Sequence, residues 1–115
     1  MLAQGYAFGE SKTPPHPNHI ACSQDLRRHV LEGPGVTYPD LRQRMAKRAA
    51  GGAQIDAPYD ELAGHIGDAA YKVTEDQVAK VVRRAGNERA AFELIIAAAV
   101  GAGLCRWDAG LAMLK

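Results

Sequence analysis

The chain has almost no net charge, and this bears first on its partners. Its 115 residues include 14 Lys and Arg and 13 Asp and Glu, which gives a formal net charge of +1. Such a balance supplies no overall field to attract nucleic acid or an anionic membrane. The one basic cluster falls on a single expected helix and comprises Arg42, Arg44, Lys47 and Arg48. No aromatic residues are interleaved for base stacking, so we predict a solvent-exposed face and no nucleic-acid partner.

Cysteines are scarce, and no secretory signal stands at the N-terminus. Cys22 and Cys105 lie far apart in the sequence. Residues 1–20 hold Gly, Pro, His and Asn, where a signal would have a basic segment followed by an apolar one. These absences predict a cytoplasmic protein with free thiols and no disulfide framework.

Long hydrophobic runs and strand-like alternation are also missing. The longest apolar stretch without charge runs only from Leu94 to Cys105, well short of the roughly 20 residues needed to cross a bilayer. We therefore expect no membrane partner. Because no segment sustains a two-residue alternation, the sequence predicts an all-α fold.

Large apolar side chains are few, so the core should be thin. The hydrophobic fraction is 47%, but alanine makes up much of it, and aromatic residues are only 6%. At about 25 cal/mol per Å² of buried apolar surface, alanine contacts stabilise less than leucine contacts. We predict a single domain that buries further surface as a homo-oligomer. Small residues should allow neighbouring helices of that oligomer to approach closely, namely Ala98, Gly101 and Ala102.

Proline and glycine divide the chain into parts. Residues 1–21 contain several of both and show no helical period, which predicts a flexible N-terminal arm before a helical domain over residues 22–115. Within that domain we expect a first helix over 25–32. A second should follow Thr37 as its N-cap and end at Gly51, and a third should run from Tyr59 to about Lys72.

The last two helices have the clearest boundaries. Thr74-Glu75-Asp76-Gln77 is a capping box, and the helix that it starts should end at Gly86. Asn87 is the expected N-cap of a final helix that runs to Lys115. Because this helix is apolar nearly all round, we expect it at the centre of a bundle of about five helices. The residues predicted to be most buried are Val78, Val81, Phe92, Ile95, Ile96, Val100 and Leu104.

Three stretches between Tyr71 and Leu111 carry a family resemblance. They read K-V-T-E-D-Q-V-A-K-V-V-R-R-A-G, F-E-L-I-I-A-A-A-V-G-A-G and R-W-D-A-G-L. A capped helix ending at glycine, followed by a glutamate-led, alanine-rich helix and an arginine-containing turn, resembles the alkylhydroperoxidase D-like, carboxymuconolactone decarboxylase superfamily. The resemblance covers the C-terminal part of the chain. It implies an all-α bundle and, as an activity, a thiol-dependent antioxidant (peroxidase-type) reaction.

The resemblance also implies roles for individual residues. The family's active helix carries a Glu and, further on, a Cys-x-x-Cys pair and a His. Here Glu93 would be the proton acceptor and Cys105 the nucleophile, whereas Asp108 stands in place of the second cysteine and Ala112 in place of the histidine. A dithiol cycle needs two sulfurs. This departure favours a non-catalytic structural or interaction subunit. An antioxidant enzyme that uses Cys105 with Glu93 is the alternative, and lactone or carboxylate chemistry at Glu93, Asp108 and His65 is a third.

Helix geometry bears on the pair of Glu93 and Cys105. An unbroken helix would separate them by about 18 Å along its axis, at about 1.5 Å per residue, and a break at Gly101 or Gly103 would bring them closer. Without a break, Glu93 should pair locally, and Cys105 should be a small core residue. The negative charge of Asp108 disfavours a thiolate, so we predict a structural Cys105 without peroxide turnover.

Two further groups contain side chains suited to chemistry. His65 stands four residues after Glu61 and three before Asp68, so both carboxylates would lie on its side of a helix. Two interpretations are open: His65 acts as an acid/base group or metal ligand, or the three side chains form only a ladder of exposed salt bridges. The second group has the H-x2-H-x2-C spacing of soft metal ligands and consists of His16, His19 and Cys22. Because no fourth ligand stands nearby, we expect no bound metal, and nothing in the sequence indicates a cofactor.

Overall fold

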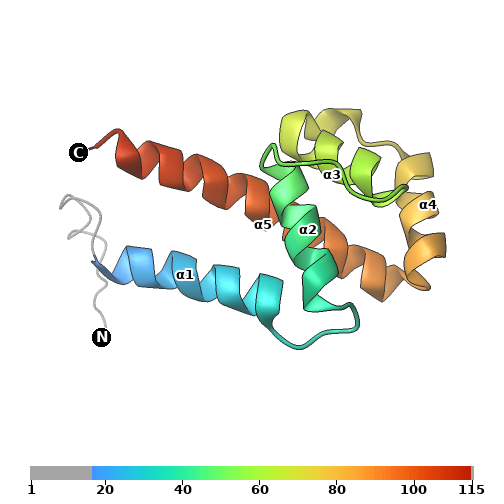
Figure 1. Cartoon of the computed structure of the whole chain (residues 1–115), viewed down its shortest axis with the longest axis horizontal. Coiled ribbons are helices and arrows are strands. Elements are labelled where there is room, and N and C mark those ends of the chain that lie inside the picture. Colours follow the sequence, from blue (N-terminus) through green and yellow to red (C-terminus); the bar gives the residue numbers. More distant parts are fainter. Residues whose placement is uncertain (1–16, 115) are drawn as a thin grey trace, which may run out of the picture.

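The computed structural model describes residues 17–114 and folds them into five α-helices (Figure 1). The helices are α1 (Pro17–Glu32), α2 (Pro39–Ala49), α3 (Tyr59–Asp68), α4 (Glu75–Ala85) and α5 (Glu88–Ala112), with a short 3-10 turn at Ala70–Lys72. None of the described residues forms a strand. The predicted all-α class is therefore confirmed.

The centre of the fold is α5. It contacts each of the other four helices, and its contact with α2, which crosses it, is the most extensive. In Figure 1, α3 and α4 lie around the N-terminal half of α5, whereas α1 runs beside its C-terminal half in the opposite direction. The central position predicted for the last helix is confirmed.

The boundaries of α4 and the start of α5 follow from local hydrogen bonds. The Thr74 side chain accepts from the Gln77 N–H at 3.1 Å, and the Gln77 side chain accepts from the Thr74 N–H at 3.2 Å. Gly86 ends α4 in the left-handed conformation with φ of 108°, which glycine adopts without steric cost. Asn87 then accepts from the Ala90 N–H at 2.8 Å. These capping predictions are confirmed.

Small residues bring α2 and α5 into close contact. Ala97 and Ala98 are fully buried, and Ala102 is 4% exposed. A Cβ atom at Gly101 would lie 2.5 Å from the carbonyl oxygen of Ala46, too close for any side chain. The small residues that were predicted to meet another copy of the chain therefore pack inside this one, and that part of the association prediction is wrong.

The predicted set of most buried residues is only partly right. Val81 is fully buried and Leu104 is 8% exposed, but Phe92 is 60% exposed and Ile96 is 36% exposed. Three others are half-buried: Val78, Ile95 and Val100. Because α5 is apolar on both sides, periodicity alone does not identify its inner face. The close crossing with α2 selects the side with the small residues.

A glycine also sets the packing of α3. A Cβ atom at Gly67 would lie 1.8 Å from the carbonyl oxygen of Ala49, so α3 meets the end of α2 at backbone contact. The carbonyl of Gly67 accepts a hydrogen bond from Arg106 of α5 at 2.6 Å. The last turn of α3 is thus fixed by both α2 and α5.

Four predicted boundaries shift, and one of them is the end of α5, which lies at Ala112 and not at Lys115. α1 begins at Pro17, so residues 17–21 belong to a helix and not to the predicted arm, of which residues 1–16 lie outside the described part. Proline is well suited to the first turn of a helix because its missing N–H has no partner there. The N-cap of α2 is Tyr38 and not Thr37. α3 stops at Asp68, where Ala69 becomes extended.

The basic cluster of α2 was predicted to form one exposed face. That prediction is wrong for Arg42, which is only 3% exposed. Its guanidinium donates to the Val30 carbonyl oxygen at 2.7 Å and also to the carbonyl oxygens of Gly33 and Thr37. The last carbonyls of a helix lack partners within the helix. Arg42 therefore closes the C-terminal end of α1 and the loop that follows it.

Two other arginines of that cluster have carboxylate partners. Arg48 pairs with Asp60 of α3 at 2.6 Å, with both side chains largely covered. Arg44 pairs with Asp40 at 3.0 Å on the surface. Of the four residues in the cluster, Arg44 and Lys47 agree best with the predicted exposure to solvent.

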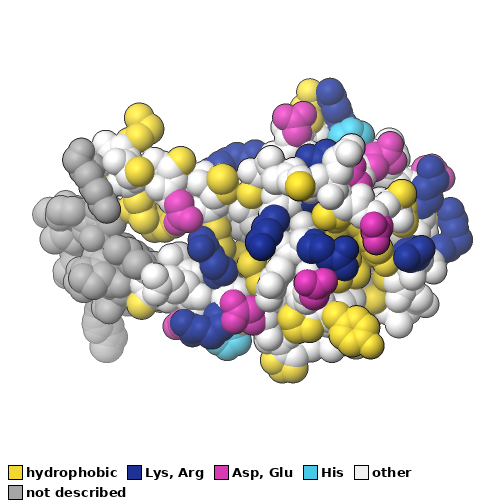
Figure 2. All heavy atoms as spheres, viewed as in Figure 1, with side chains coloured by type: hydrophobic (Ala, Val, Ile, Leu, Met, Phe, Trp, Pro, Cys, Tyr) yellow, Lys and Arg dark blue, Asp and Glu magenta, His cyan; other side chains and the backbone are white. Residues whose placement is uncertain are grey.

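The length and hydropathy of α5 would also suffice to span a membrane, which the sequence analysis did not expect. The helix has 25 residues, and 39% of its most apolar window is buried within the fold. A large part of its apolar surface therefore faces outward. Figure 2 shows hydrophobic side chains along the C-terminal half of α5 with few charged ones among them.

Candidate functional site

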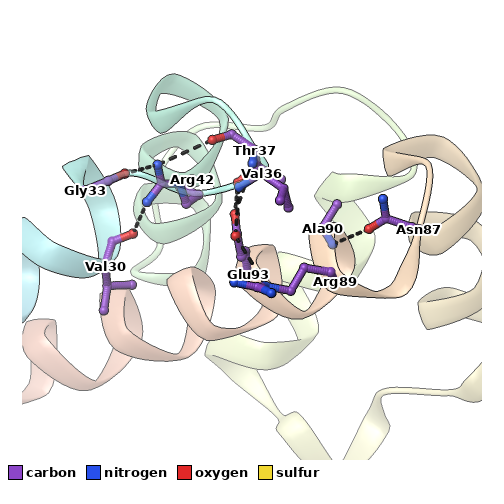
Figure 3. Close-up of polar contacts among 9 residues, drawn as sticks. All are labelled: Val30, Gly33, Val36, Thr37, Arg42, Asn87, Arg89, Ala90 and Glu93. Atoms are coloured by element: carbon purple, nitrogen blue, oxygen red, sulfur yellow. Dashed lines mark hydrogen bonds and ion pairs between the residues drawn. The ribbon is translucent and has the colours of Figure 1, made fainter.

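Glu93 binds the loop between α1 and α2 (Figure 3). Its carboxylate accepts hydrogen bonds from the Val36 N–H at 2.9 Å, the Thr37 N–H at 3.0 Å and the Thr37 hydroxyl at 2.7 Å. The side chain is 15% exposed, and Arg89, one turn earlier, lies 3.9 Å away. A Cβ atom at Gly35 would lie 2.8 Å from the carboxylate oxygens, so the loop approaches Glu93 closely. Glu93 therefore tethers this loop to α5.

The surroundings of Glu93 favour its ionised form. Burial opposes the charge, but the hydrogen bonds from Val36 and Thr37, together with the charge of Arg42, outweigh that effect and lower the pKa of Glu93 below its usual 4.5. A general base works best with a pKa near the operating pH. With a lowered pKa and three donors already bound, Glu93 is suited to holding the loop and poorly suited to accepting a proton.

Glu93 and Cys105 do not come together. α5 is continuous from Glu88 to Ala112, and neither Gly101 nor Gly103 interrupts it. The two side chains are consequently about 18 Å apart along the helix axis. The proton-acceptor role that the family resemblance implies for Glu93 toward Cys105 has no geometric support here. The local partner expected for Glu93 is found only in part, because its main partners belong to the loop before α2.

Cys105 is exposed, which contradicts the prediction of a small core residue. Its sulfur lies 4.0 Å from the carbonyl oxygen of Ala50 at the end of α2. The helix turns this position toward the gap between α2 and α3, where a polar cleft of about 710 Å³ opens. The charged and titratable side chains along the cleft are Arg48, Asp60, Glu61, His65, Asp68 and Arg106.

His65 lies in the same cleft as Cys105 and contacts α4. Its Nδ1 is 2.9 Å from the side-chain nitrogen of Gln77, whose oxygen already accepts from the Thr74 N–H. The Gln77 oxygen lies 3.3 Å from the same ring nitrogen, so both ends of the amide are within reach of His65. The capping box of α4 thus also orients His65, a contact that the sequence pattern around Glu61 and Asp68 did not indicate.

Asp60 is an ionised, largely covered carboxylate at one wall of the cleft. The pKa of Asp60 is lowered, first by a hydrogen bond from the Ile55 N–H at 3.0 Å and also by Arg48, against the opposing effect of burial. It stays ionised at neutral pH and fixes Arg48 against α3. The arginine is therefore a structural part of the wall, as is Arg106 through its bond to Gly67.

Asp108 lies on the other side of α5 and points toward α1. Its carboxylate pairs with Arg27 at 3.0 Å, and both side chains are about half exposed. It lines a second, smaller hollow between α1, α2 and α5, and Cys105 also borders that hollow. The negative charge predicted to act on the Cys105 thiol is thus partly balanced by an arginine that is distant in sequence.

The candidate metal cluster of His16, His19 and Cys22 falls largely outside the described residues. His16 and the side chain of His19 lie outside the described residues, and Cys22 is exposed on α1. Among the described side chains, no group of three His, Cys, Asp or Glu is placed to hold a metal ion. Of the four predicted site residues, Cys105 shares the polar cleft with His65 and the smaller hollow with Asp108, whereas Glu93 lines neither.

No family model, curated protein or solved structure matches this chain.

Proposed function

We propose that this chain is a non-catalytic structural or interaction subunit, similar in its C-terminal part to the alkylhydroperoxidase D-like superfamily, and that it acts in the cytoplasm. The observation that carries this proposal is the outward face of α5. Phe92 is 60% exposed, Trp107 41% and Leu114 68%, in a chain with few large apolar residues. Exposed apolar surface of this kind is typical of protein interaction sites.

The state of Glu93 supports the non-catalytic part of the proposal. The residue that would accept a proton in the related enzymes is occupied by three hydrogen-bond donors of the loop before α2. Asp108 stands where the second sulfur of a dithiol cycle would be, and it is paired with Arg27. A peroxide cycle on Cys105 would then need an external thiol to reduce the sulfenic acid.

Peroxide consumption tests the proposal directly. Wild type, Cys105→Ser and Cys22→Ser should consume an organic hydroperoxide at the same background rate in the presence of a dithiol reductant. Cys22→Ser is the matched control because both cysteines are exposed. Turnover well above the background that is lost in Cys105→Ser and kept in Cys22→Ser would refute the non-catalytic reading.

A thiol-dependent antioxidant enzyme is the second candidate, and one observation favours it. Cys105 is exposed and shares a cleft with His65, so a peroxide could reach the sulfur. In that reaction the thiolate attacks the O–O bond, the sulfur becomes a sulfenic acid and an alcohol leaves; two external thiols then restore the cysteine as water and a disulfide form. The rate of alkylation at neutral pH separates the two functions, with Cys22 as internal reference. An activated Cys105 would react much faster than Cys22, and a non-catalytic one at a comparable rate.

A further inference from the structure

The outward face of α5 carries a regular row of exposed residues that no other helix of the described chain covers fully. Seven exposed positions follow one another at steps of three or four. Six of them lie in α5 and the last in the turn after it: Phe92, Ile96, Ala99, Gly103, Trp107, Gly110 and Leu114. Such steps place residues along one side of a helix. We call this row the outer strip. It runs on the side of α5 opposite the contact with α2.

Two glycines in the outer strip have no role within the chain. A Cβ atom at Gly103 or at Gly110 would meet nothing within 4 Å, in contrast to Gly101 on the inner side. Neither has the positive φ that requires glycine, as Gly51 and Gly86 do. Glycine inside a helix is destabilising relative to alanine. Their place between large apolar residues suits the close approach of a second helix.

The outer strip is complementary in shape to the same strip of a second, antiparallel copy. If a second α5 lies antiparallel with the symmetry axis at Gly103, Trp107 of one copy falls opposite Ala99 of the other, and Ile96 falls opposite Gly110. Phe92 and Leu114 then meet at each end, and the two Gly103 positions meet at the centre. Each large side chain in the middle of the strip faces a small residue. A two-fold interface needs a surface that is complementary to itself in this way.

Charge also permits this pairing. From Phe92 to Leu114 the outer strip contains no charged residue. Arg106 lies beside the strip and donates to the Gly67 carbonyl of its own chain, and Arg89 lies one step before Phe92, outside the paired span. No like charges therefore meet at the axis.

From this pattern we infer that two copies of the chain pair through the outer strips of α5, antiparallel and with the two-fold axis at Gly103. The inference rests on the proposed interaction function and names its partner. The strip is about 33 Å long and about 10 Å wide. Two strips then cover an area on the order of 700 Å², which is at the low end for protein interfaces. The dimer is therefore weak and forms in the micromolar range or above.

Sedimentation equilibrium between about 5 and 500 µM tests the pairing, with the emission of the single Trp107 as a second readout. The wild-type mass should rise from monomer toward dimer, and the emission should shift to the blue as Trp107 leaves water. Ile96→Glu should weaken association at least tenfold. Tyr38→Glu, at a residue that is 83% exposed and distant from the strip in sequence, is the matched control and should leave it unchanged.

Cysteine cross-linking tests the axis. In a chain with Cys22→Ser and Cys105→Ser, Gly103→Cys should form an interchain disulfide rapidly on mild oxidation, because the two positions meet at the axis. Gly110→Cys, an equally exposed helix glycine, should not, because its two copies would be about 21 Å apart along the antiparallel helices. Equal cross-linking of both variants would indicate parallel helices and overturn the inference.

Two other results would also overturn it. One is a wild-type chain that stays monomeric at the highest concentration. The other is a monomeric chain whose Trp107 emission shifts to the blue only with phosphatidylcholine vesicles, which would assign the outer strip to a lipid surface. Neither result depends on peroxide turnover, so the pairing can fail while the non-catalytic proposal stands, and the reverse also holds.

Discussion

The part of α5 up to Leu104, here called the enclosed half, and the shorter part after it, the open half, have very different surroundings. All seven buried residues of the helix fall in its first part, from Ala90 to Leu104, and none follows Leu104. The first part is enclosed by α2, α3 and α4, whereas α1 accompanies the second. Burial along this helix is thus set by how many helices surround it and not by how apolar it is. Apolar residues in the second half remain available for contacts outside the chain.

The largest expected effect lies in the enclosed half. Leu94 is fully buried, so Leu94→Ala should lower the free energy of unfolding by about 2–5 kcal/mol through lost apolar contacts and a cavity. Leu114→Ala, in the open half, should change it by no more than about 0.5 kcal/mol. Urea denaturation measured at a low, monomeric concentration compares the two. Equal losses would refute the contrast between the halves.

The tether at Glu93 should give the next largest effect, and that effect should depend on pH. Glu93→Gln replaces a carboxylate that accepts three hydrogen bonds, and about 1.5–3 kcal/mol of stability should be lost at neutral pH. The folded pKa of Glu93 is below its usual 4.5. Its contribution is therefore complete above pH 4.5 and is lost as the pH falls through the folded value.

The difference between wild type and Glu93→Gln should consequently shrink in acid. Thermal unfolding followed at several pH values from 7 to 3 would measure it. Asp60, whose pKa is also lowered, is present in both proteins and cancels in the difference. A stability difference that is constant down to the lowest pH would show that Glu93 is not the titrating tether.

A smaller gain is expected in the open half. Gly110 is an exposed glycine inside α5, and a Cβ atom there meets nothing within 4 Å. Gly110→Ala should therefore raise the free energy of unfolding of the monomer by about 0.5–1 kcal/mol. Gly101→Ala, at the crossing with α2, should instead lower it. If both substitutions changed stability in the same direction, the assignment of inner and outer sides would be wrong.

The smallest effect should come from the ion pair that joins α1 to the open half. Arg27 and Asp108 are 3.0 Å apart and about half exposed, and exposed pairs contribute about 0.2–1 kcal/mol. Arg27→Ala should cost no more than this, and 1 M salt should abolish the difference. A loss of several kcal/mol would mean that α1 is held to α5 mainly by this pair.

Local signals were enough to predict much of the helical framework. The capping box at Thr74 and Gln77, the glycine stop at Gly86 and the Asn87 cap each act within a few residues, so the sequence specifies them directly. By contrast, the partners of Arg42 and Glu93 lie in the last turn of α1 and in the loop at residues 33–37, and they depend on how α1 returns over α5. The solvated position predicted for Arg42 is wrong because nothing nearby in the sequence indicates those carbonyls.

The candidate site was predictable only in part for the same reason. Cys105 and His65 could be selected by residue type, but their shared cleft follows from the placement of α3 beside α5. One signal could have identified the role of Glu93. It is the single charge in the long apolar stretch of α5, and a buried carboxylate needs hydrogen-bond donors. The hydrogen-bonding loop with its small Gly35 is such a set of donors.

Gly67 has a consequence for how this sequence can vary. A methyl group at this position would overlap the carbonyl oxygen of Ala49, and both residues line the cleft beside Cys105. In a library with every codon randomised and selected only for soluble folded protein, position 67 should return almost nothing but glycine. Neighbouring positions such as Asp68 should accept many residues. As related sequences diverge, we therefore expect position 67 to remain glycine while the positions around it change.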